Sequence, residues 1–168
     1  MLDGAVQRTH YILHSTSGAS MSNRACLLAL GLVLAGPNTH SQTQAAEILR
    51  SARSLRCAFP SGGSEVLTDA KPRYQPAQGA DGVFDDIDRG KGTARVIGRA
   101  GAGNVRVIAS PETLTLIEIS SAGYPQMTVV FGAFRPYTME LVASDSRHAI
   151  VAGRVLVEQY YGSCRVLQ

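Results

Sequence analysis

Four consecutive residues in the stretch SDSRHAIVAGRVLVEQYYGSC carry the side chains that most readily perform chemistry. They are Asp145, Ser146, Arg147 and His148. A nucleophilic serine needs a histidine within hydrogen-bond reach and a third group that orients the histidine. In an extended strand, Ser146 and His148 share a face about 6 to 7 Å apart, which is too far for direct contact. We therefore assign no catalytic residue and expect this segment to form a turn or bulge at a corner of a β-protein. A hydrolase that uses Ser146 and His148 remains the enzymatic alternative.

Three residues near the C-terminus are candidates for binding. We expect Arg147 to pack along one of the two adjacent tyrosines, Tyr160 and Tyr161. Neighbouring residues of a strand point to opposite faces, so one tyrosine ring should enter the core and the other should lie outside. The outer ring then either contacts a partner or shields the last strand.

Other polar clusters do not predict a metal or cofactor site. The aspartates of DGVFDDIDRG, residues 81–90, do not have the spacing of a calcium-binding helix–loop–helix, so a solvated strand edge with pairing to Arg89 or Lys91 is expected. The glycine-rich stretch 98–104 has no helix after it to bind phosphate, so it predicts a hairpin turn. Glu118 lies in an apolar strand and, if buried, requires a partner such as Arg95 or Arg106.

The composition argues against a nucleic-acid partner. The chain has 168 residues, with 16 basic and 13 acidic side chains, and the basic residues are scattered rather than clustered. It contains no tryptophan and 6% aromatic residues, which leaves few surfaces on which bases can stack. The apolar content of 45% is that of a globular domain.

The N-terminal region has the pattern of a secretory signal peptide. An apolar run of 11 residues, Ala25 to Ala35, follows Arg24, and small residues stand at Thr43 and Ala45. A membrane-spanning helix needs about 20 apolar residues, so the run is too short for one. We expect residues 1–20 to be an upstream extension from a mis-assigned start, residues 21–45 to be the signal peptide and residues 46–168 to be the mature domain. The product is then secreted or periplasmic, with no stable membrane anchor.

The mature chain keeps two cysteines, Cys57 near its start and Cys164 near its end. An even number of cysteines in an exported domain typically forms disulfides, so these two are expected to be bonded. They offer too few ligands for a zinc site, because His148 is the one histidine that the mature chain would retain.

Short β-branched segments dominate the chain after Gly82. They recur every 8 to 14 residues, with turn residues between them. This pattern predicts an all-β fold, a single small antiparallel β-barrel or sandwich of about eight strands whose first and last strands are joined by the disulfide. Before it, we expect a short strand that Pro60 ends and then a long loop over residues 61–82, with one short strand around Glu65 to Leu67. In the strand around Val129, we expect Met127, Val129 and Phe131 to share the inward face.

The same segments resemble a family of uncharacterised secreted bacterial β-proteins. The likeness lies in the aspartate-rich strand FDDID, the turn ARVIGRAG, the strand LTLIE and the ending SRH … QYYGSC, and it covers Phe84 to Cys164. The segment FRPYTMELVASD departs from the family, where a plainer hairpin is expected. The resemblance implies export and a β-fold, and it implies no activity.

Three functions fit these observations. The first is a non-enzymatic exported domain that binds a small apolar ligand or an envelope or extracellular protein in the mouth of the barrel. The second is an envelope interaction or inhibitor protein that acts through the 61–82 loop. The third is the hydrolase described above. A ligand-sized cavity would favour the first function over the others.

Overall fold

A computed structural model describes residues 38–68, 71–98 and 101–167 of the chain. The expected upstream extension lies outside the described residues, as does the expected signal peptide except for residues 38–45. One helix, α1 (Asn38–Ser51), precedes the strands. The strands are β1 (Leu55–Val66), β2 (Tyr74–Pro76), β3 (Gly82–Asp88), β4 (Thr93–Gly98), β5 (Gly101–Ala109), β6 (Thr113–Ile119), β7 (Pro125–Phe134), β8 (Leu141–Val151) and β9 (Arg154–Val166).

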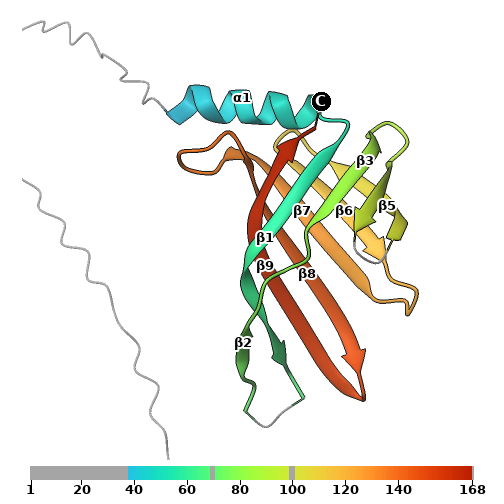
Figure 1. The fold of residues 1–168 in the computed structure, drawn as a ribbon. Helices are drawn as coiled ribbons and strands as arrows, with labels where there is room; N and C mark the ends of the chain where they lie inside the picture. Colours follow the sequence, from blue (N-terminus) through green and yellow to red (C-terminus); the bar gives the residue numbers. More distant parts are fainter. Residues whose placement is uncertain (1–37, 69–70, 99–100, 168) are drawn as a thin grey trace, which may run out of the picture. The chain divides into compact units, whose positions relative to one another are not determined.

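The strands form a closed antiparallel barrel. From β3 to β9 each strand pairs with the next along the chain, and β1 pairs with both β3 and β9, which closes the sheet (Figure 1). The barrel therefore has eight strands, and β2 is an extra strand paired to the far half of β1. The all-β prediction is confirmed, and of its two alternatives the barrel is the one that forms. Closure leaves no unpaired edge along the ring of strands.

The predicted disulfide closes the barrel seam. Cys57 of β1 and Cys164 of β9 lie opposite each other in the register, with their Cα atoms 4.0 Å apart, and their sulfurs are bonded. Both cysteines are fully buried. The prediction that a disulfide joins the first and last strands is confirmed.

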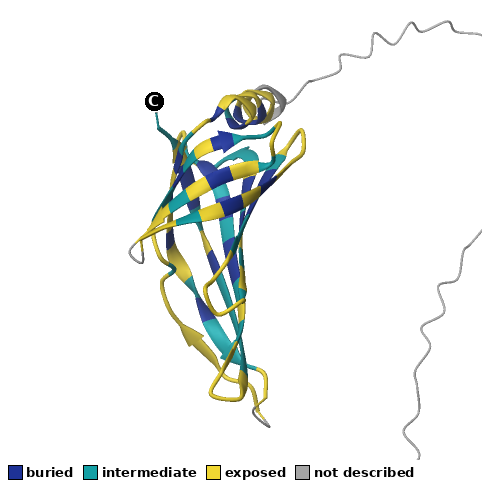
Figure 2. Ribbon diagram, turned by 90° about the vertical axis from the view of Figure 1, so that its right-hand side faces the viewer, coloured by how far each residue is buried: buried dark blue, intermediate teal, exposed yellow. Residues whose placement is uncertain are grey.

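Buried and exposed residues alternate along the strands of the barrel (Figure 2). In β7 the alternation is opposite to the prediction: Thr128 and Val130 are buried, whereas Met127 and Phe131 are 39% and 36% exposed. The face with Met127, Val129 and Phe131 is the more apolar one, so hydrophobicity alone favours the register that does not form. Pairing with β6 decides, because Leu114 and Leu116 lie opposite Val130 and Thr128 and all four side chains point inward.

Pro60 does not end the first strand. β1 continues to Val66, and its pairing with β9 shifts register between Ala58 and Ser61. Proline lacks the backbone N–H, and a bulge is a position where a strand does not need that donor. Much of the predicted 61–82 loop is thus strand, in β1 and β2.

The cluster that begins at Asp145 is not a corner. Residues 141–151 form the uninterrupted strand β8, paired with β9 from Leu141–Cys164 to Val151–Arg154. The turn comes later, at Ala152 and Gly153, which have φ values of 50° and 76°. Two successive residues with positive φ are typical of the tight turn that suits the twist of a two-stranded hairpin.

Helix α1 packs across one end of the barrel (Figure 1). Ala45, Leu49 and Ala52 belong to the buried core cluster with residues of the strands. The approach is close: a Cβ atom added to Gly132 of β7 would lie 2.9 Å from the Cα of Ala46. A glycine is therefore required where the helix contacts β7.

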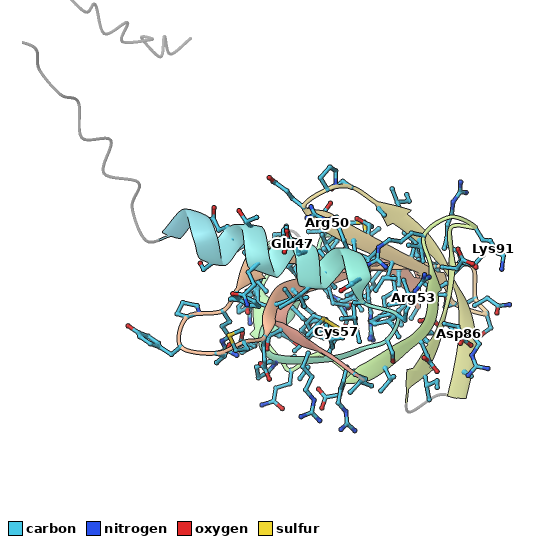
Figure 3. All side chains as sticks on the ribbon, turned by 90° about the horizontal axis from the view of Figure 1, so that it is seen from above. Glu47, Arg50, Arg53, Cys57, Asp86 and Lys91 are labelled. Carbon is cyan, nitrogen blue, oxygen red and sulfur yellow. A yellow bond between two sulfur atoms is a disulfide. The ribbon has the colours of Figure 1, made fainter. Side chains whose placement is uncertain are left out.

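Two arginines join the end of this helix to β3. The Arg89 guanidinium donates hydrogen bonds to the carbonyls of Leu49 and Ala52, the latter at 2.7 Å. The last carbonyls of a helix have no partner within the helix, so these bonds cap it. Arg53, which follows the helix (Figure 3), donates in return to the Ile87 carbonyl at 3.2 Å. Burial, and secondarily the nearby Arg53, lowers the pKa of Arg89.

Candidate ligand-binding site

Strand alternation separates the four residues with which the sequence analysis began. Asp145 and Arg147 point into the barrel, where both line a cavity. Ser146 and His148 lie on the other face of β8, where Ser146 is buried and His148 is exposed. A serine hydrolase needs the serine, the histidine and the carboxylate in one chain of hydrogen bonds. The structure places the carboxylate on the opposite side of the strand from the other two.

The cavity lies inside the barrel at the end opposite α1. Its volume is about 300 Å³. Phe59, Phe84 and Val96 form an apolar part of its wall, and residues 80–82 form part of its rim. The polar part of the wall comes from neighbouring strands: Glu118, Gln126, Thr128, Asp145 and Arg147.

The polar wall is built from two adjacent rows across the sheet. In one row, Leu116 of β6 lies opposite Thr128, Thr128 opposite Asp145, and Asp145 opposite Tyr160. The next row, nearer the open end, reads Glu118, Gln126, Arg147 and Glu158. Towards α1 the interior positions are apolar, with residues such as Leu114 and Val130. The barrel interior therefore changes from apolar to polar along its length.

Asp145 is the most deeply buried charged group of the described structure, with a relative exposure of 2%. Its Oδ2 accepts hydrogen bonds from Thr128 Oγ1 at 2.7 Å and from Gln126 Nε2 at 2.9 Å. Burial raises the pKa of this carboxyl, against the opposing effects of the two hydrogen bonds and of Arg147. Its second oxygen, Oδ1, has no hydrogen-bond partner among the described residues.

Arg147 is a loosely fitting partner for this carboxylate. Its Nε lies 3.6 Å from Asp145 Oδ1, within range of an ion pair and beyond that of a hydrogen bond. The Nε atom is buried and also lacks a hydrogen-bond partner within the described part of the chain. Glu158 of β9 lies opposite Arg147 in the register. The pKa of the nearby Tyr160 is raised, first by burial and second by the negative charge of Glu158.

The segment that follows β2 completes the rim. Ala77 and Gly79 donate backbone hydrogen bonds to the carbonyls of Gly62 and Phe59, both at 2.9 Å. It thereby covers the part of β1 that does not pair with β3. A Cβ on Gly79 would clash with the side chains of Phe59 and Tyr160, so a glycine lets the rim contact these rings closely. The 61–82 region thus contributes to the barrel mouth.

The two tyrosines lie as predicted, with Tyr160 buried inside and Tyr161 exposed outside. Glu118 lines the cavity, and the ion pairs of the described residues do not include it, so the expected pairing with Arg95 or Arg106 does not form.

The aspartates of β3 lie on the outside of the barrel. Asp88 pairs with Lys91 at 3.1 Å and Asp86 with Arg95 at 3.5 Å, and Asp86 and Lys91 lie at the periphery when the barrel is seen from the helix end (Figure 3). The backbone N–H of Lys91 and its ammonium lower the pKa of Asp88. In the described ranges, no three His, Cys, Asp or Glu side chains gather in a group that could hold a metal ion.

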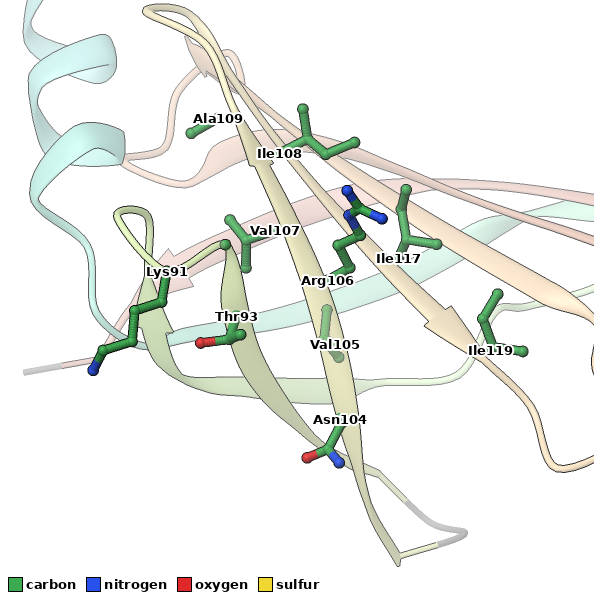
Figure 4. Close-up of a pocket in the computed structure, with 11 residues that line it drawn as sticks. Lys91, Thr93, Asn104, Val105, Arg106, Val107, Ile108, Ala109, Ile117 and Ile119 are labelled. Carbon is green, nitrogen blue, oxygen red and sulfur yellow. The ribbon is translucent and has the colours of Figure 1, made fainter.

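A larger hollow lies on the outer surface of β4, β5 and β6. It measures about 750 Å³ and is an open trough, in which Arg106, Ile108, Ile117 and Ile119 are outward-facing residues (Figure 4). Its polar side chains do not converge on a common point, and it lacks buried charge. The smaller interior cavity has both an enclosing wall and a buried carboxylate, so it is the better candidate for a specific site.

Of the residues that line the cavity, the sequence analysis named Asp145 as a catalytic candidate and Arg147 as a binding candidate, and it did not consider Gln126, Thr128 or Phe59 as site residues. The sequence contains an ambiguous signal for Thr128. A hydroxyl residue between Met127 and Val129 fits a polar row inside the barrel as well as a position on its outer face. Only the pairing with Asp145 across β7 and β8 distinguishes these two options.

None of the helices in the described part of the chain has the length and apolar character needed to cross a membrane. No protein-family model, curated protein or solved structure matches this chain.

Proposed function

We propose that this protein is an exported, non-enzymatic domain that binds a small ligand in the open end of its barrel. The observation that carries the proposal is the cavity of about 300 Å³ that reaches a buried carboxylate with one unpaired oxygen. An unpaired buried acceptor costs about 1 to 3 kcal/mol, so a ligand that supplies a donor there would gain free energy.

The wall suits a ligand with two different ends. Phe59, Phe84 and Val96 offer an apolar surface, as expected for the apolar ligand inferred from the sequence. Asp145 and Arg147 add a polar end, so the ligand needs a hydrogen-bonding or charged group as well. Small closed barrels are well suited to such ligands, because the rigid wall holds both surfaces in place.

Export is part of the proposal. The buried disulfide between Cys57 and Cys164 supports an oxidising compartment, since structural disulfides are rare in the cytosol. The apolar run Ala25 to Ala35, which follows Arg24, supports the same location, secreted or periplasmic.

Native mass spectrometry of protein purified without detergent, after expression of the full chain, is the first test. An adduct of constant mass that is released on unfolding would support the proposal and identify the ligand class. A bare polypeptide that also takes up nothing from an extract of its host's growth medium and envelope would contradict it.

Matched variants place the ligand. Gly98→Phe directs a ring into the cavity from a position where an added Cβ meets no atom within 4 Å. Ile97→Phe puts the same ring on the outer face of the same strand, where Ile97 is already exposed. The first variant should lose the adduct and the second should keep it. Retention of the adduct by both would place the ligand elsewhere.

A further inference from the structure

We propose that the ligand carries a positively charged nitrogen, which takes the place of the Arg147 guanidinium beside Asp145. This inference rests on the proposed function and names its ligand class, an organic amine or amidine with an apolar body. In the ligand-free protein, the Arg147 guanidinium would then occupy the position beside Asp145, and the ligand would displace it.

The charges around the cavity favour a cation. Three carboxylates, Asp81, Glu118 and Asp145, contribute to its lining, whereas Arg147 is the one basic residue there. Glu158 adds a fourth acidic group in the register opposite Arg147. Three acidic groups in the lining, of which Asp81 is solvent-exposed, and Glu158 beside it outnumber the single cation. This excess of negative charge attracts a second cation and repels an anion.

The loose pairing of Asp145 with Arg147 makes displacement feasible. Charge-assisted hydrogen bonds normally span about 2.7 to 2.9 Å, whereas Arg147 Nε stands 3.6 Å from Asp145 Oδ1. Both atoms remain without hydrogen bonds in the described structure. An ammonium or amidinium group, which is not tethered to β8, can approach Oδ1 to hydrogen-bond distance. The ligand thus forms a bond that the protein's own arginine does not make.

The Arg147 side chain can also move from Asp145 to a second carboxylate. This side chain is 33% exposed, against 2% for that of Asp145, so it is the partner that can move. Glu158 on β9 lies opposite it and is the nearest carboxylate by register other than Asp145. Transfer of the guanidinium from Asp145 to Glu158 keeps both charges paired and opens the path to Oδ1.

The apolar wall fits the remainder of such a ligand. Phe59 and Phe84 lie in the same cavity as Asp145, and both are buried residues. Aromatic rings attract cations through their faces, and they also accept apolar groups. An anionic ligand gains from Arg147 alone and must approach the carboxylates, so the wall as a whole selects against it.

A panel of matched small molecules tests the inference. The probes share one of three bodies, benzyl, hexyl or cyclohexylmethyl, and each body carries an amine, an alcohol or a carboxylate. Binding to the folded protein is followed by amide chemical shifts in NMR titrations at pH 7.5. The amines should bind at least about tenfold more tightly than the alcohols with the same body, and the carboxylates least, because a hydrogen bond between two charged groups is stronger than one from a neutral donor.

Four variants give this test its controls. Asp145→Asn keeps the side-chain shape and should remove the preference for amines. Arg147→Gln removes the positive charge that competes with the ligand and should raise the affinity for amines several-fold. Arg147→Lys keeps a positive charge and should leave this affinity near the wild-type value. Arg106→Gln, on the outer surface, should change nothing. Far-ultraviolet circular dichroism and the amide spectrum verify that each variant is folded.

The outcomes separate this inference from the proposed function. If alcohols or carboxylates bind as tightly as amines, or if Arg147→Gln weakens the binding of amines, the ligand class is wrong and the cavity remains a binding site. If carboxylates bind best and lose affinity in Arg147→Gln, the arginine is an anion receptor, which overturns the inference. If no probe shifts the amides that line the cavity, both the inference and the proposed function fail.

Discussion

The two ends of this barrel are built from the same strands and differ in what fills them. At the end near α1, the interior is apolar, is cross-linked by Cys57–Cys164 and is covered by a helix capped through Arg89. At the other end, the same strands place Thr128, Asp145 and Arg147 inside, around a cavity. One end is closed and satisfied, and the other is open and holds charged atoms without hydrogen bonds.

The stabilising apolar contacts and the candidate binding site therefore lie at opposite ends of the barrel. Burial of apolar side chains stabilises by about 25 cal/mol per Å² of apolar surface, and the end near α1 fully buries Leu49, Leu55 and Leu114. A buried carboxylate with a loosely fitting partner has a desolvation cost that its contacts repay only in part. Polar groups that cost stability are typical of binding sites, because a ligand can supply what the fold leaves unpaired.

Removing the disulfide should have the largest effect on the closed end. The two cysteines are separated by 107 residues, and closing so long a loop stabilises by about 4 to 5 kcal/mol in the chain-entropy model. Cys57→Ala with Cys164→Ala should lose about that free energy of unfolding, measured by urea titration. Reduction of the wild-type protein is the control and should give the same loss. A loss below about 1 kcal/mol would mean that the crosslink adds little to the packed end.

A pair of glycines compares the two ends directly. Gly132→Ala brings a methyl group against Ala46 of α1 and should cost about 1 to 3 kcal/mol, because the helix must shift. Gly98→Ala at the open end meets open space and should change stability by less than about 0.5 kcal/mol. Thermal and urea unfolding of both variants measure the difference. Equal effects would show that α1 is not held tightly against β7.

The helix cap should rank next. Arg89→Met leaves the carbonyls of Leu49 and Ala52 without this donor and should cost about 1 to 2 kcal/mol. Arg95→Met removes the exposed ion pair with Asp86 and serves as the control, with an expected cost of about 0 to 0.5 kcal/mol. Hydrogen exchange of the α1 amides should rise in Arg89→Met alone. Unchanged exchange there would contradict a capping role for Arg89.

The smallest expected effect on stability belongs to Asp145. Its pKa is raised in the folded state, so the folded protein holds this proton at pH values where the unfolded chain has released it. The contribution of Asp145 to stability therefore falls as pH rises from about 4, the usual carboxyl pKa, through the raised folded value. Arg147, Glu158 and Tyr160 face this carboxyl and are unchanged when Asp145 alone is substituted, so the difference between the two proteins isolates Asp145.

Urea unfolding across pH checks this sign. Asp145→Asn should flatten the fall in stability relative to wild type and should cost little at pH 7, since the amide oxygen still accepts from Thr128. Parallel pH profiles for the two proteins would mean that the carboxylate is solvated in the folded state. A loss of several kcal/mol in Asp145→Asn at pH 7 would instead make the open end a stabilising element.

Much of the fold was predictable from local signals. The strands from Val83 onward are indicated by β-branched residues between turn residues. The two cysteines of the expected mature chain, Cys57 and Cys164, predict the disulfide. The strand break at Pro60 was wrong, because a bulge lets proline remain in a strand. The corner at Ser144–His148 was wrong for a related reason: polar residues in sequence suggest a turn, yet here they line the inside and outside of one long hairpin.

The sequence by itself determined that short strands would form, that they would follow one another antiparallel and that a disulfide would join the ends. These features depend on period, turn chemistry and residue type, which neighbouring residues fix. Only the tertiary structure decided that Asp145 and Arg147 face inward while Ser146 and His148 face outward. The reason is that a strand's two faces are chosen by register with its neighbours, and a shift of one residue exchanges them. The candidate site exists because that choice gathers Gln126, Thr128 and Asp145 in one wall.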